Sequence, residues 1–125
     1  MTESQTDTVI NIPNAFKKID APWDPHVAGD VNNAQVKIAK LSGAFDWHAH
    51  ENEDEAFFVI SGSFDLELRD RTLTLGEGDF FVVPRGVEHR PVAHEECCVM
   101  LIEPASTLNT GDQHTEKTKS TLKRV

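Results

Sequence analysis

The chain has 125 residues, of which 38% are hydrophobic, enough for one domain with a modest core. Its net charge of −9 argues against partners such as nucleic acid or an anionic membrane, because both need basic patches. It has no apolar run of about 18 residues, and its polar, acidic start differs from a signal peptide, so we expect no membrane span and a cytoplasmic location.

The first quarter of the chain carries few strand signals. We expect residues 1–12 to be disordered and residues 13–19 to form a short helical turn. The next stretch, which is punctuated by Pro22, Pro25 and Gly29, is predicted to be a loop.

From residue 34 onward the pattern becomes almost entirely β. Some segments alternate apolar and polar residues, which indicates half-buried strands, and others are continuous apolar runs that suit strands covered on both faces. These segments are 34–39, 57–60, 64–69, 80–83 and 97–102. Short strands separated by turn signals, without a long helix, predict an all-β sandwich or barrel. We expect the domain to occupy 13–108 and a flexible tail to occupy 109–125.

Three histidines and one glutamate form the clearest functional pattern. His48 and His50 should share one face of a strand, because side chains two residues apart point the same way. Glu55 should open the next strand after a reversing loop, and His89 follows a turn into a later strand. Only a closed or nearly closed β fold would bring His89 to the others. Three imidazoles and one carboxylate suit a divalent transition metal.

The spacing of these residues resembles the two sequence motifs of the cupin family. The first motif matches over residues 43–62, with one gap a residue short, at Gly43, His48, His50, Glu55 and Gly62. The second matches over residues 78–93, with Ala93 in place of the usual asparagine, at Gly78, Pro84, Gly86 and His89. The resemblance implies a small single-domain cupin of the RmlC-like superfamily. Its fold would be a jelly-roll barrel, or double-stranded β-helix, that holds a metal inside one open end.

The resemblance also implies a set of metal ligands and a range of functions, but it does not decide which reaction the metal serves. His48, His50, Glu55 and His89 would hold one divalent ion of iron, manganese, nickel or zinc. A metalloenzyme acting on a small acid or enediol is favoured, with a dioxygenase first and an isomerase or lyase second. The alternatives are a non-catalytic cupin that binds or senses a small acid or sugar, and a structural metal site. The chain has no tyrosine, which excludes any mechanism that needs one.

Three further residues near the second motif are weaker candidates. Arg85 and Arg90 flank the turn before and after His89 and are candidates to bind a substrate carboxylate. His94 lies five residues past His89, so strand parity places it on the opposite face.

We expect a homodimer, because small cupins usually dimerise by pairing sheets or exchanging an N-terminal strand. Trp23, Val27, Val31 and the strand at 34–41 precede the first motif and are the candidate contact surface. Continuous apolar strands in so small a chain also favour a partner that covers their outward faces.

Overall fold

The computed structural model describes residues 8–125, so the disorder expected over 1–12 falls mainly outside the described part of the chain. The first elements are helix α1 (Ile12–Ala15) and the 3-10 turn η1 (Phe16–Lys18), which confirm the short helical turn predicted over 13–19. Asn11 begins the helix, because its side chain accepts a hydrogen bond from the backbone amide of Asn14 at 2.9 Å.

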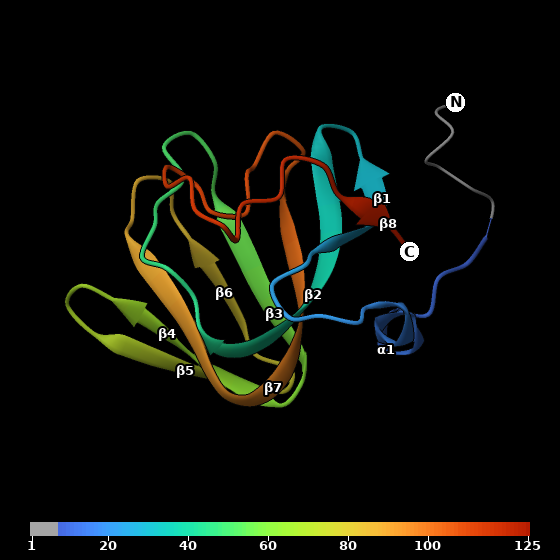
Figure 1. Cartoon of the computed structure of the whole chain (residues 1–125), viewed down its shortest axis with the longest axis horizontal. Coiled ribbons are helices and arrows are strands. Elements are labelled where there is room, and N and C mark those ends of the chain that lie inside the picture. Colours follow the sequence, from blue (N-terminus) through green and yellow to red (C-terminus); the bar gives the residue numbers. More distant parts are fainter. Residues whose placement is uncertain (1–7) are drawn as a thin grey trace.

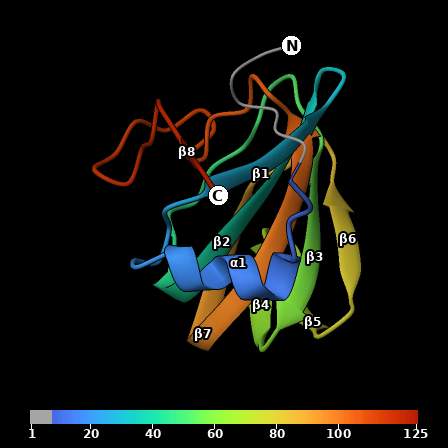
Figure 2. The same cartoon turned by 90° about the vertical axis from the view of Figure 1, so that its right-hand side faces the viewer.

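The remaining elements are strands that close into the predicted jelly-roll barrel. They are β1 (His26–Val31), β2 (Ala34–Ala44), β3 (Glu55–Ser61), β4 (Ser63–Leu68), β5 (Thr72–Gly76), β6 (Phe80–Val83), β7 (His89–Pro104) and β8 (Lys123–Arg124). The sheet order is β5-β4-β7-β2-β1-β8, and β3 joins it by pairing with both β6 and β7. Figures 1 and 2 show the strands curling around a common interior, with α1 packed on the outside.

Strand β7 holds the barrel together, because it forms ladders with three partners. Its first residues pair with β4, its length pairs with β2, and its second half also pairs with β3. From His89 to Glu103, buried side chains alternate with less buried ones in both halves of the strand. The short segment between these halves is exposed. One face of β7 therefore points into the barrel at both ends of the strand.

The loop expected around Pro22 and Gly29 is wrong in its second half, because strand β1 begins at His26. β1 and β2 form an antiparallel hairpin that turns at Asn32 and Asn33. Asn32 has φ 54°, in the left-handed region that asparagine tolerates better than most residues. The Asn-Asn pair is thus a turn signal that the proline and glycine pattern concealed.

Two apolar clusters lie on opposite faces of β2. The cluster inside the barrel includes Ala39 and Leu41 of β2, with Val59, Leu66 and Val99 from other strands. The second cluster lies outside, where α1 and η1 cover the other face of β2; its buried members are Ala15, Phe16, Ile19 and Ile38. Both faces of β2 are therefore buried, which stabilises this strand at the centre of the sheet.

The segment from Asn109, for which the sequence predicts a flexible tail, follows a defined path along the top of the barrel in Figure 1. We call residues 105–122 the strap. The backbone amide of Asp112 donates to the carbonyl of Ala49 at 2.9 Å, and the Asp112 carboxylate accepts from the Ala49 amide at 3.0 Å. Thr110 is fully buried. After the strap, β8 pairs in parallel with β1.

Across residues 8–125, none of the helices has the length and apolar character needed to cross a membrane.

Candidate metal centre

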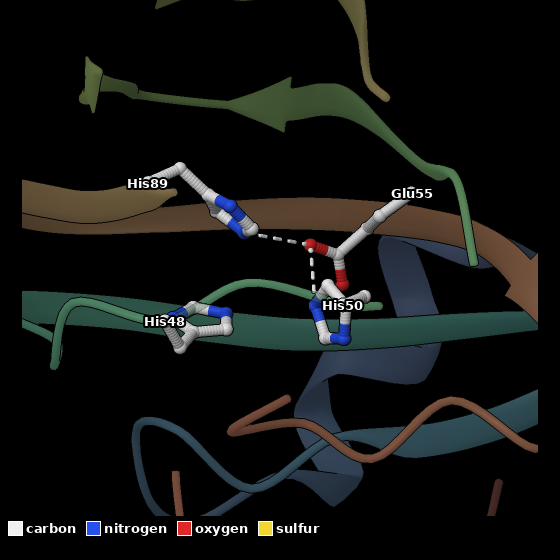
Figure 3. Close-up of side chains that lie close together, drawn as sticks. All are labelled: His48, His50, Glu55 and His89. Carbon is white, nitrogen blue, oxygen red and sulfur yellow. Dashed lines mark hydrogen bonds and ion pairs between the residues drawn. The ribbon is translucent and has the colours of Figure 1, made fainter. Parts of the chain in front are cut away.

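The four side chains predicted as metal ligands come together inside the barrel. One donor atom from each of them lies within 4.8 Å of the others; the residues are His48, His50, Glu55 and His89. All four residues are between 0 and 4% exposed. In Figure 3 they point toward one another from three separate parts of the chain. Glu55 is the first residue of β3, His89 is the first of β7, and the other two lie between β2 and β3.

Backbone hydrogen bonds, and not a regular strand, hold the two neighbouring histidines. The strand expected around His48 and His50 is reduced to an isolated bridge between His48 and His89. These two residues exchange both backbone hydrogen bonds, at 3.1 and 2.9 Å. The carbonyl of His50 accepts from the amide of Gly86 at 2.8 Å. The turn before β7 therefore fixes the positions of all three histidines.

The ring orientations of His48 and His89 favour a cation at the centre. The Nδ1 atom of His48 donates to the carbonyl of Asp46 at 2.9 Å, and that of His89 donates to the carbonyl of Val87 at 2.9 Å. A carbonyl oxygen only accepts, so the proton of each neutral ring is on Nδ1 and Nε2 carries a lone pair. The Nε2 atom of His89 nevertheless lies 3.2 Å from Oε1 of Glu55. Two acceptors at this distance need either a proton or a metal ion between them.

The remaining spacing also fits an ion. The Nε2 atom of His50 lies 3.3 Å from the same Glu55 oxygen, and neither ring nitrogen of His50 has a hydrogen-bond partner among residues 8–125. Donor atoms that each sit about 2.1 Å from a metal are about 3.0 Å apart at an octahedral edge and about 3.4 Å apart in a tetrahedron. The two distances from Glu55 to His50 and His89 therefore match those between neighbouring ligands of one ion.

The electrostatics of the site keep two of its four donors, Glu55 and His48, available to a metal. Burial, together with the nearby His89, lowers the pKa of His48 to about 4. Burial opposes the ionisation of Glu55, but contacts with His50 and His89 outweigh it and hold the Glu55 pKa well below its ordinary value. Burial also opposes the charging of His50, yet the contact and charge of Glu55 raise the pKa of His50. An ionised Glu55 and an unprotonated His48 are the forms that bind metal.

A small cavity inside the barrel adjoins this group. Its volume is about 50 Å³. His48 and Glu55 lie on its wall, and most of the other lining side chains are apolar, including Trp23, Leu41, Phe45, Phe57 and Leu101. A ligand in this cavity would contact the candidate metal site directly.

The sequence did not reveal a buried ion pair on the same cavity wall. Lys37 Nζ donates to Oε2 of Glu103 at 2.6 Å, and both side chains are almost completely buried. Burial and the negative charge of the nearby Glu55 raise the pKa of Glu103 well above its ordinary range, and Lys37 opposes this. A cation held by Glu55 would offset that repulsion. Strand parity counted from His89 along β7 would have placed Glu103 in the barrel.

The three weaker candidates lie outside the cavity wall. Arg85 approaches Asp54 at 3.5 Å and is exposed. Arg90 pairs with Glu67 at 2.7 Å. The side chain of His94 is 81% exposed, as parity predicted for a residue facing away from His89.

Comparisons with known proteins agree with this fold. Residues 35–103 match the family model Cupin_2, the cupin domain. The chain belongs to the cupin family. This cupin is 43% identical to a cupin-2 domain protein from Shewanella frigidimarina, whose crystal structure it matches with a TM-score of 0.75 over 77% of this chain and 94% of that one. It matches the protein NMB1881 from Neisseria meningitidis with 30% identity and a TM-score of 0.72, over 78% of this chain and 100% of that one. It is also 28% identical to the "Uncharacterized protein YdbB" of Bacillus subtilis over 80% of this chain and 87% of the relative.

Proposed function

We propose that this cupin binds one divalent transition metal ion through His48, His50, Glu55 and His89, and that it acts on a small acid or an enediol-type substrate. The observation that carries the proposal is the convergence of the His48 and His89 lone pairs on an ionised Glu55, beside a cavity. Iron, manganese, nickel and zinc all accept this donor set.

A bound divalent ion would supply Lewis acidity to a substrate oxygen. The side chains of the chain itself provide the surroundings. Glu55 offsets only part of the charge of a divalent ion, and the positive charge that remains favours an anionic substrate. The apolar side chains of Phe57 and Leu101 line the cavity and exclude water. Of the reaction classes open to such a site, a dioxygenase is our first choice and an isomerase or lyase our second.

A second candidate function is binding or sensing without turnover. The observation that favours it is the burial of all four donor residues, together with the strap that crosses this end of the barrel. A small acid or sugar held there would be enclosed, and its binding would stabilise the strap against the barrel.

The first test is the metal content of protein purified without chelator, with a chelator-stripped sample as control. We expect about one ion per chain, and we expect the stripped protein to take up the same amount again. Loaded protein is then incubated with glycolate, lactate and the three-carbon enediol reductone while dioxygen and products are followed. Turnover supports an enzyme, and a rise in melting temperature without turnover supports a sensor. The proposal is rejected if neither sample binds a divalent ion.

We also propose that the cupin forms a homodimer, through a surface other than the one expected from the sequence. Val27 is buried and the Trp23 ring packs against Phe45 with centroids 4.7 Å apart, so these two residues serve their own chain, whereas Val31 is 61% exposed and stays a candidate contact. A different apolar patch is exposed on the outside of β6, β3 and β7. Phe80 is 57% exposed, Val82 is 41% exposed and Ile102 is 37% exposed. The register places Val82 and Ile102 on either side of Ala56. A second copy would cover this patch.

The substitution Val82→Glu should convert the dimer to a monomer, because it would bury a carboxylate on each side of an apolar contact. Sedimentation velocity of the parent and the variant measures this. Val9→Glu is the matched control, since Val9 is 92% exposed and lies outside the patch. A parent protein that is monomeric at high concentration, or a Val82→Glu variant that remains dimeric, would show that the patch has another role.

A further inference from the structure

Lys37 and Glu103 place two opposite charges inside the barrel, beside the candidate metal site. Their side chains are 3% and 2% exposed, and they come from β2 and β7, 66 positions apart in the sequence. A buried ion pair of this kind is usually no more stabilising than apolar side chains of similar size. Because both residues line the cavity beside Glu55, their position points to ligand binding.

Each member of the pair keeps one hydrogen-bonding position unused. Lys37 Nζ donates to Glu103 Oε2 at 2.6 Å and to the carbonyl of Thr107 at 3.2 Å. An ammonium group has three donors, so one is left over. Oε1 of Glu103 is buried and accepts from no donor among residues 8–125, although the Glu103 carboxyl group also lies next to that of Glu55. The pair therefore offers one donor and one acceptor. A hydroxyl group, which both accepts and donates, satisfies both positions at once.

The size of the cavity limits the ligand. One water molecule needs about 10–15 Å³ of cavity volume, so a cavity of about 50 Å³ admits only a small ligand. His48 and Glu55 lie on the same wall as Lys37 and Glu103. A ligand of about three carbons would therefore reach the metal ligands and the ion pair together.

We infer that Lys37 and Glu103 recognise a hydroxyl group, and that the substrate is a small acid or enediol with one further hydroxyl beyond the oxygens that bind the metal. This inference rests on the proposed function. A neutral hydroxyl suits the subsite better than a second carboxylate, because Glu103 already matches the charge of Lys37 and its free oxygen repels an anion.

Two acids that differ by a single hydroxyl test the subsite. Glycerate and lactate share the carboxylate and the adjacent hydroxyl, but glycerate has a terminal hydroxyl where lactate has a methyl hydrogen. Isothermal titration calorimetry of the metal-loaded cupin should give a Kd for glycerate at least about 10-fold lower than for lactate, as expected for a hydrogen bond to charged groups. Equal affinities in the parent would overturn the subsite and leave the proposed function standing.

Variants assign the preference to the pair. The double substitution Lys37→Met with Glu103→Leu removes both charges and leaves none unpaired, so the fold should be retained. The Kd for lactate divided by the Kd for glycerate should fall from at least about 10 to about 1, and the affinity for lactate should not change. Glu103→Gln, which keeps the size of the side chain, should also reduce the ratio. Lys40→Met is the control, because Lys40 lies on the same strand but outside the cavity wall.

The outcomes separate the two proposals. If the loaded parent binds neither acid, the inferred substrate class is wrong together with the proposed function. If the parent prefers glycerate and the double variant keeps that preference, another part of the cavity reads the hydroxyl and the subsite is wrong.

Discussion

Replacing His89 with alanine should abolish metal binding while leaving the barrel folded. His89 is fully buried, and its Nε2 atom lies 3.2 Å from the Glu55 carboxylate. Its loss removes a donor and leaves Glu55 without one of its two imidazole contacts. Loss of a partner in the outer shell of a metal site already costs about 10–100-fold in affinity, so the loss of a ligand should cost more than about 100-fold. Elemental analysis and competition with a chelator measure the change.

His94→Ala is the matched control for this experiment. It is the same substitution on the same strand, but the side chain of His94 is exposed and faces away from the site. The hydrogen bonds that tie His89 to His48 use backbone atoms, so circular dichroism should show a folded barrel in both variants. A His89→Ala protein that still binds one ion as tightly as the parent would contradict the ligand set.

Gly111→Ala should detach the strap and open the metal site. Gly111 has φ 58°, and a Cβ atom there would lie 2.3 Å from the carbonyl oxygen of Ala49 and 3.1 Å from the His48 ring. The left-handed conformation costs alanine about 1–2 kcal/mol, and the overlap with backbone adds to this. Since about 1.4 kcal/mol corresponds to a factor of ten, removal of the ion by a chelator should be at least about 10-fold faster. Stopped-flow measurement of metal release tests this.

Gly78→Ala separates backbone strain from overlap. Gly78 has φ 87°, but a Cβ atom there meets nothing within 4 Å. This control therefore carries the conformational cost without the collision, and it should leave the rate of metal release unchanged. The backbone amide of Ala49 donates a hydrogen bond to the Asp112 carboxylate, and its hydrogen exchange should accelerate only in Gly111→Ala. Equal release rates in the two variants would mean that the strap does not cover the site.

The metal ligands were predictable from the sequence because their signals are local. The interval between His48 and His50 fixes a shared direction, and the proline and glycine before His89 mark a turn that the structure contains. The type of fold followed from short apolar segments separated by turns. The flanking strands were harder to predict: β1 was concealed by its glycine and proline neighbours, and β7 begins eight residues before the predicted strand at 97–102.

Lys37 and the strap were not predictable in the same way. On β2, Lys37 alternates with Val36 and Ile38, which is the pattern of a charged side chain facing solvent. In the structure α1 and η1 cover Ile38, so the apolar residue faces outward and the lysine faces the cavity. The polar composition of the strap likewise indicates a free tail. The strap is attached through hydrogen bonds to backbone groups of Ala49, and such contacts cannot be predicted from amino-acid composition.

The three ladders of β7 also affect how the chain folds during its synthesis. During synthesis β2 emerges well before β7, on which most of its ladder partners lie. Until then only β1 pairs with β2, and its other edge is free to pair with a neighbouring chain. We expect closure by β7 to be a late step, because it unites β2, β3 and β4 at once and also brings His89 to the other donors. A bound metal ion should then slow the unfolding of the finished barrel more than it accelerates folding.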